Sequence, residues 1–153
     1  MEQLSQLLWS GYGPNRDDLK KTSASSRGKY PFDIYVFMSI GIFKYLPDEN
    51  ALELINNKDY RASTGTQDFV ANASVDIVLV GVLEREADLG DVDLMKAKMD
   101  LDTGHVLQNM FMYAASEGLK CVPRGMFVEA DLLKILELDS TKYYIPLTAS
   151  IGK

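Results

Sequence analysis

Two short polar segments carry the groups best suited to bind a ligand. Residues 25–28 contain two serines, an arginine and a glycine, and residues 123–125 form a Pro-Arg-Gly turn. Serine hydroxyls can donate hydrogen bonds to ligand oxygens. Arg124 and Gly125 can each offer a free amide N–H, which Pro123 lacks. Each segment also has an ordinary interpretation, as a surface loop or a tight turn. Together they predict polar binding without a catalytic acid or base.

The single histidine, His105, and the single cysteine, Cys121, exclude several kinds of chemistry. One chain cannot form an internal disulfide, a cysteine metal cluster or a histidine pair. No metal site is therefore expected. His105 is interpreted as a helix-surface or interface residue, and Cys121 as a small buried hydrophobe.

Length and charge indicate one globular domain over residues 1–153. The chain has 46% hydrophobic and 25% charged residues and a net charge of −6. Nucleic acids and anionic membranes need concentrated lysine and arginine, so neither is expected as a partner. The N-terminus lacks a signal-peptide pattern, and no apolar run is long enough to span a bilayer. We therefore expect a cytoplasmic protein.

Hydrophobic periodicity predicts the elements that must position the two polar segments. A short helix should end at the glycines and proline of residues 11–14. The polar stretch 15–29 is typical of a mobile loop. Strands are predicted over residues 33–38, 42–46, 51–55 and 75–80, the last of them a buried central strand.

The longest helix should run from about Val92 to Glu117, where Gly118 ends it. Its first half is amphipathic, with Leu94, Ala97 and Leu101 expected to face the core. Its second half is apolar on nearly all sides, so it must be covered on several sides. A second subunit would cover it, which predicts a homodimer. The alternative is a central helix wrapped by its own sheet.

The remaining segments complete an α+β pattern. A strand over 120–122, a helix over 129–136 and a final strand over 143–151 follow the long helix. A meander combined with strands separated by helices predicts a mixed or antiparallel sheet packed with helices.

Several segments, in the right order, resemble the nitroreductase family. Residues 21–35 (KTSASSRGKYPFDIY) are similar to the family pattern R-T-A-P-S-A-x-N-x-Q-P-x-D-I-Y, and residues 122–127 (VPRGMF) to the loop beside its flavin ring. Weaker similarity covers residues 7–16 and 67–75, so the resemblance spans nearly the whole chain.

The resemblance implies a nitroreductase-like fold, with the long helix at a dimer interface and FMN bound there. NAD(P)H would serve as co-substrate, and a small-molecule electron acceptor such as a nitroaromatic or quinone would be reduced. Arg124 and Met126 would contact the substrate, and Tyr30 would contribute from the partner subunit. The implied cofactor-binding residues are Ser25, Ser26, Arg27, Gly28, Tyr30, Gln67, Pro123, Arg124, Gly125 and Lys153.

The sequence departs from the family pattern at the positions that hold the flavin. Ala24 and Gly28 stand where the family has proline and asparagine. No arginine-rich segment precedes residue 7, although the family uses one to bind the FMN phosphate. Two alternatives therefore stay open. One is a degenerate, non-catalytic flavin-binding module, and the other is an azoline-type dehydrogenase that acts on peptides. The local basic residues that could replace the arginines are Arg16, Lys20, Lys21, Arg27, Lys29 and Lys153.

Overall fold

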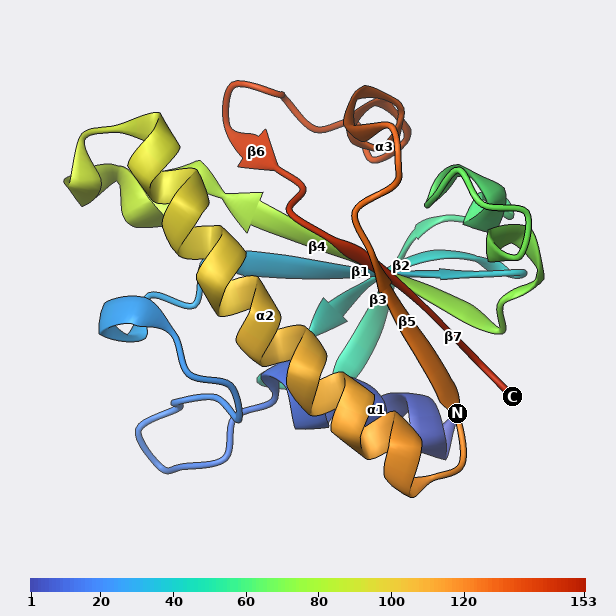
Figure 1. The fold of residues 1–153 in the computed structure, drawn as a ribbon. Helices are drawn as coiled ribbons and strands as arrows, with labels where there is room; N and C mark the ends of the chain where they lie inside the picture. Colours follow the sequence, from blue (N-terminus) through green and yellow to red (C-terminus); the bar gives the residue numbers. More distant parts are fainter.

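Seven β-strands form one sheet in which every pair of neighbours is antiparallel. The computed structural model describes residues 1–153. The strand order is β3-β2-β1-β4-β7-β5, and β6 pairs with the end of β4 (Figure 1). The strands are β1 (Phe32–Met38), β2 (Gly41–Leu46), β3 (Ala51–Asn56), β4 (Val75–Val82), β5 (Lys120–Arg124), β6 (Tyr143–Tyr144) and β7 (Thr148–Gly152). The α+β class predicted from the sequence is confirmed.

Three α-helices and four short 3₁₀ segments accompany the sheet. The α-helices are α1 (Glu2–Tyr12), α2 (Val92–Ser116) and α3 (Glu129–Ile135). The 3₁₀ segments are η1 (Ser26–Gly28), η2 (Arg61–Ser63), η3 (Val70–Asn72) and η4 (Leu83–Leu89). None of the helices is long and apolar enough to cross a membrane.

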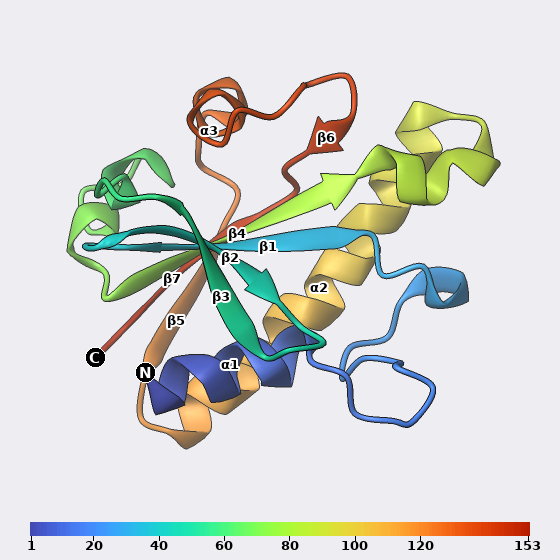
Figure 2. The same ribbon diagram turned by 180° about the vertical axis from the view of Figure 1, so that it is seen from behind.

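The sheet is buried on both faces because side chains alternate along each strand. On one face, Ile77 and Leu79 of β4 belong to a core that α1 and α2 cover. On the other face, Val78 and Val80 pack with residues of α3. Figures 1 and 2 show these two layers from opposite sides. β4 lies between β1 and β7, which confirms the predicted central strand.

The orientation predicted for the first half of α2 is wrong. Leu94 and Leu101 are 44% and 66% exposed, whereas Met95 and Met99 are buried against the sheet. Both faces of this half carry apolar residues, so their spacing alone could not tell which face packs inward. The second half is buried on one side only. The boundaries of the helix and the left-handed Gly118 that follows it agree with the prediction.

The C-terminal strands differ from the predicted ones in two ways. β5 continues through Pro123 and Arg124, which the sequence predicts as a turn. Because β5 is the edge strand and pairs only with β7, the missing amide of Pro123 can face away from its partner. The predicted strand over residues 143–151 is divided into β6 and β7 around Pro146.

Candidate functional site

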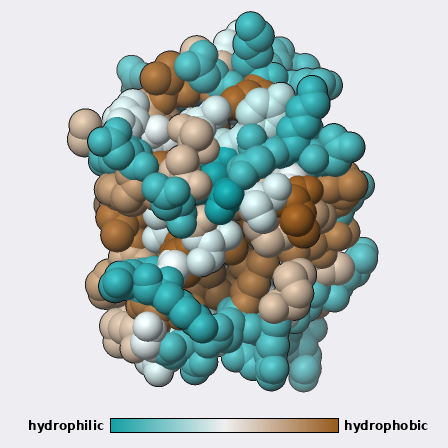
Figure 3. All heavy atoms as spheres, turned by 90° about the vertical axis from the view of Figure 1, so that its right-hand side faces the viewer, coloured by the Kyte–Doolittle hydropathy of each residue, from teal (hydrophilic) through white to brown (hydrophobic).

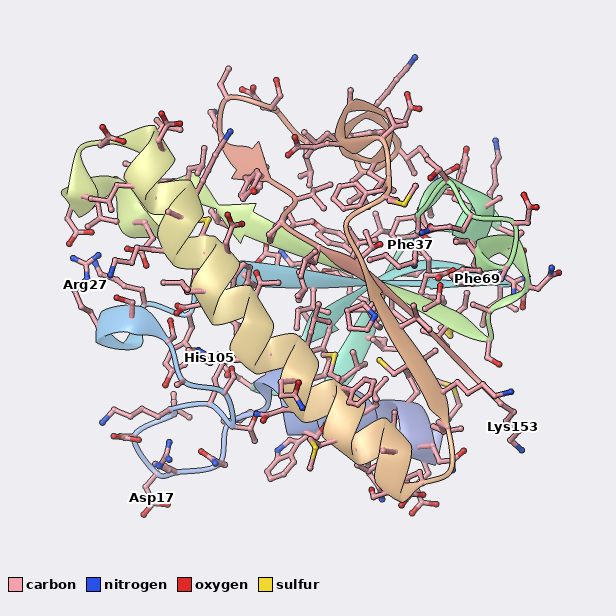
Figure 4. All side chains as sticks on the ribbon, viewed as in Figure 1. Asp17, Arg27, Phe37, Phe69, His105 and Lys153 are labelled. Atoms are coloured by element: carbon pink, nitrogen blue, oxygen red, sulfur yellow. The ribbon has the colours of Figure 1, made fainter.

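The predicted ligand-binding residues lie in two groups on opposite sides of α2. Figure 4 shows Arg27 and its loop to the left of this helix, and Lys153 at the end of β7 to its right. The left-hand group comprises residues 25–30. The right-hand group comprises Gln67, residues 123–126 and Lys153. Within one chain the predicted residues therefore form two separate groups rather than one continuous cluster.

Asp102 of α2 anchors the left-hand loop. Its carboxylate accepts hydrogen bonds from the Ser25 hydroxyl, at 2.6 Å, and from the Ser26 amide, at 3.0 and 3.2 Å. The Ser25 oxygen in turn accepts a bond from the Tyr30 amide at 2.9 Å. The Asn109 side chain donates to the Thr22 carbonyl at 3.2 Å. This network fixes a loop that the sequence predicts as mobile.

The sequence analysis missed Asp102, because only the folded structure shows that this acidic residue is 4% exposed on the inner face of α2. Buried carboxylates need hydrogen-bond partners, and the docked loop supplies them.

The remaining residues of this loop are held by charge and by unusual backbone geometry. The guanidinium of Arg27 contacts Asp88 and lies 2.6 Å from the buried carboxylate of Glu86. Arg27, Gly28 and Tyr30 all adopt positive φ angles. Such conformations strain residues other than glycine, so the surrounding contacts must impose them. The rest of the fold thus holds this loop in a defined conformation.

Arg124, in the right-hand group, is turned into the protein. Its side chain is 1% exposed, and its guanidinium lies 3.0 Å from the carboxylate of Asp76 on β4. It also donates to the Thr64 carbonyl at 2.7 Å. Ser150 donates a second hydrogen bond to Asp76. The guanidinium is therefore engaged in the interior and is not free to contact a substrate, and the whole residue is only 4% exposed.

Burial determines the proton affinities of this pair. Removal from water raises the pKa of Asp76 to about 6, although Ser150 and Arg124 both stabilise its charged form. Burial also lowers the pKa of Arg124, against the opposing effect of Asp76. The pair is charged near neutral pH, and Asp76 is within reach of protonation in mild acid.

The buried pair links two surface loops. The Arg124 side chain donates a hydrogen bond to the Thr64 carbonyl. Two residues further on, the Thr66 amide donates to the Met126 carbonyl at 3.0 Å. A Cβ at Gly65 would come within 1.8 Å of the Arg124 guanidinium, so glycine is needed for this close approach. The loop that carries Gln67 and the turn that carries Gly125 are consequently clamped together.

Each of these clamped loops presents an unused polar atom. The Gly125 amide is exposed and donates no hydrogen bond within the protein. The Gln67 side-chain oxygen is buried and has no donor. Buried polar atoms are nearly always paired, so the unpaired oxygen of Gln67, in a loop bonded to the Gly125 turn through Thr66 and Met126, calls for a partner outside the chain.

Two adjoining cavities lie around the end of β7. Their volumes are about 480 and 280 Å³, and both are lined by Ser74, Ile151, Gly152 and Lys153. Lys120 also lines the larger one. Figure 3 views the side on which Phe69 and Lys153 lie in Figure 4, and apolar atoms gather across its middle between hydrophilic areas. The cavities offer apolar walls together with two lysines.

Comparison with known proteins gives a consistent result. A model of the nitroreductase family matches residues 1–153. The crystal structure of a nitroreductase homologue from Ralstonia eutropha JMP134 is 33% identical and has a TM-score of 0.91, covering 99% of this chain and 72% of that one.

Two further structures are similar in fold at lower identity. A chain of the Escherichia coli microcin synthetase McbBCD complex, solved with truncated pro-MccB17 bound, has 18% identity and a TM-score of 0.85, with coverage of 99% and 63%. A nitroreductase homologue from Desulfovibrio desulfuricans, solved in complex with FMN, has 19% identity and a TM-score of 0.68, with coverage of 99% and 72%.

Proposed function

Because this chain belongs to the nitroreductase family, we propose that it is an FMN-dependent oxidoreductase. It takes electrons from NAD(P)H and passes them to a small-molecule acceptor such as a nitroaromatic or a quinone. The FMN complex of the Desulfovibrio homologue supports the choice of cofactor. The observation that carries the proposal is the pairing of a free donor at Gly125 with an orphaned acceptor at Gln67.

These two atoms fit the pyrimidine edge of a flavin. That edge alternates acceptors with one N–H donor, so it needs a partner of each kind. The Gln67 oxygen would accept from the ring N–H, and the Gly125 amide would donate to a neighbouring ring acceptor. Because the Arg124 clamp fixes both loops, the two contacts are preorganised.

Two lysines are the candidate contacts for the FMN phosphate. Lys153 and Lys120 line the cavity at the end of β7, and neither forms an ion pair within the protein. A lysine binds phosphate as a point charge, with less geometric specificity than a bidentate arginine. These lysines would therefore supply charge more than orientation.

The protein contributes positioning and polarity to the proposed reaction. When bound, FMN supplies a ring that accepts a hydride and delivers electrons to an acceptor. The Gly125 N–H would be placed to donate to the ring edge, where a hydrogen-bond donor favours added electron density. Met126 is 62% exposed next to this donor and is the residue that we assign to substrate contact. No side chain is needed as a catalytic acid or base.

A second copy of the chain would join the two groups of predicted residues as half-sites of one site, and the exposed face of α2 provides the surface. Seven exposed residues on α2 follow a strict 3-4 spacing, which is the pattern of a helix-pairing seam. We call this set the α2 seam. It consists of Leu94, Ala97, Leu101, Gly104, Gln108, Phe111 and Ala115.

The surroundings of the α2 seam favour a second copy as its partner. A groove of about 290 Å³ runs beside Gly104, Gln108 and Phe111 and is completed by Pro123 and Leu147. No atom lies within 4 Å of the position that a Cβ at Gly104 would take, so another backbone can approach closely. A two-fold axis through α2 would place the Ser25–Tyr30 loop of one copy opposite the Gly125 turn of the other, because these groups lie on opposite sides of the helix (Figure 4).

An absorption spectrum with an FMN titration tests the cofactor. We expect protein with bound FMN to be yellow and to bleach on anaerobic addition of NADH or NADPH. A colourless protein that excess FMN does not reconstitute would contradict the proposal. Protein that binds FMN but is not reduced would instead support the non-catalytic flavin-binding module.

A peptide-directed dehydrogenase is the second candidate. The fold resembles a chain of microcin synthetase, which was solved with a peptide precursor bound. Assays of the FMN-loaded protein with an azoline-containing peptide and with a nitroaromatic, run side by side, separate the two candidates. Turnover of the peptide alone would favour this second function.

A further inference from the structure

A separate cavity lies on the side of the molecule away from the α2 seam. It has a volume of about 290 Å³ and lies between the end of α1, the loop that precedes β1, and the turn from β2 to β3. These elements are in front in Figure 2, where α2 lies behind them. The lining residues are Tyr12, Lys21, Tyr30, Phe32, Asp33, Ile34, Lys44, Tyr45, Leu46, Pro47 and Arg85.

Positive charge is concentrated in this cavity although the whole protein carries a net charge of −6. Lys21, Lys44 and Arg85 are all in its lining, whereas Asp33 is the only acidic residue there. Asp33 already binds both Lys44 and Arg85, each at 2.7 Å. Lys44 and Arg85 share this one carboxylate, so Lys44, Arg85 and Asp33 together carry one net positive charge.

Lys21 is the least compensated of the three cations. Its side chain is 11% exposed, and its only acidic contact is a 3.6 Å approach to Asp48, which is 66% exposed. Its ammonium lies 4.9 Å from the Tyr12 ring centroid and 5.8 Å from that of Tyr30. Burial lowers the pKa of Lys21, although Asp48 opposes this effect. An anion in the cavity would replace the hydration that this ammonium has lost.

The walls that face these charges are aromatic and aliphatic. The Tyr12 ring meets Tyr30 and Phe32 edge to face, with centroid distances of 6.2 Å in both pairs. Tyr30 has a φ of 48°, a strained conformation for a residue with a side chain. Strained residues of this kind cluster at ligand sites. The cavity therefore combines an aromatic wall with a cationic end.

From this combination we propose that the cavity binds a small aryl carboxylate, with the ring against Tyr12 and Tyr30 and the carboxylate at Lys21. A volume near the lower limit for ligand pockets suits a single ring. Two compounds serve as comparison ligands. Phosphate has the negative charge but no ring, and a neutral aryl amide has the ring but no charge. The cavity shares Tyr30 with the loop of the proposed flavin half-site, but binding of an aryl carboxylate here requires no bound flavin.

Calorimetric titration of the full chain with benzoate, at constant ionic strength, tests the proposal. Benzoate should bind saturably and more tightly than benzamide or inorganic phosphate. Lys21→Gln should weaken benzoate binding about tenfold or more, because a charge-assisted hydrogen bond is lost. Lys21→Arg should bind within a few-fold of wild type. Lys20→Gln is the matched control, since Lys20 is 57% exposed and pairs with Asp18.

Three results would overturn this assignment. One is equal benzoate affinity in Lys21→Gln and Lys20→Gln, with both variants folded by circular dichroism. Another is equal binding of benzamide and benzoate. The third is displacement of benzoate by FMN, which would place benzoate in the flavin site. The titration is informative even if the protein never binds FMN, so failure here differs from failure of the proposed function.

Discussion

The amide N–H of Gly125 is the single group on which the proposed flavin contact depends most directly. Gly125→Pro removes this donor and should weaken FMN binding by about tenfold, the usual effect of one lost hydrogen bond. Gly125→Ala keeps the donor, and its Cβ would lie an ordinary 3.8 Å from the Leu147 side chain, so it should bind like wild type. Fluorescence titration of FMN measures both. Equal binding by the two variants would exclude a role for the amide.

Asp76 should make stability depend on pH. Burial raises its pKa from 3.8 to about 6, so the folded state holds this proton more tightly than the unfolded chain. Its stabilising contribution is therefore present below the unfolded pKa and is lost as the pH rises through about 6. Between about pH 4 and pH 7, the unfolding free energy of wild type relative to Asp76→Asn should fall by on the order of 2 kcal/mol. Urea denaturation across this range measures it, and parallel profiles would contradict the expectation.

The connection between β5, β4 and the Thr64 loop can be tested by removing its charges together or singly. Arg124→Met leaves Asp76 buried without its cation and should cost about 3–5 kcal/mol of stability. The double variant Arg124→Met/Asp76→Leu removes both charges and should recover most of that loss.

The double variant also separates positioning from stability. With the guanidinium absent, the Thr66 amide should exchange its hydrogen faster, because its bond to Met126 is no longer braced. Hydrogen exchange followed by NMR measures this without any flavin. Unchanged protection of Thr66 in a stable double variant would mean that Arg124 does not clamp the loops.

The proposed homodimer depends on the α2 seam. We expect light scattering to give a dimer of twice 17.1 kDa. Leu101→Glu introduces a charge at an exposed seam position and should produce a folded monomer with weakened FMN binding. Val92→Glu is the control, since Val92 is exposed on the same helix but outside the seam. A dimer that survives Leu101→Glu would place the interface elsewhere.

Much of the fold could be predicted from local signals in the sequence. The β-branched and aromatic runs indicated β1, β2 and β4, and Gly118 marked the end of α2 with its left-handed backbone. Each of these depends on the chain's own periodicity or on one residue's conformational preference. For the same reason, the ordered series of motifs was sufficient to identify the family.

Tertiary structure alone decided where the site residues lie and what they do. Both faces of α2 are apolar, so only packing against the sheet could select Met95 and Met99 as the inner side. Arg124 was expected to face a substrate, because its buried partner Asp76 is 48 positions away in sequence and gives no local signal. The docking of Ser25 on Asp102 spans 77 positions. Contacts between distant strands and loops carry no periodic signal along the chain, so folding has to bring the partners together before their roles can be recognised.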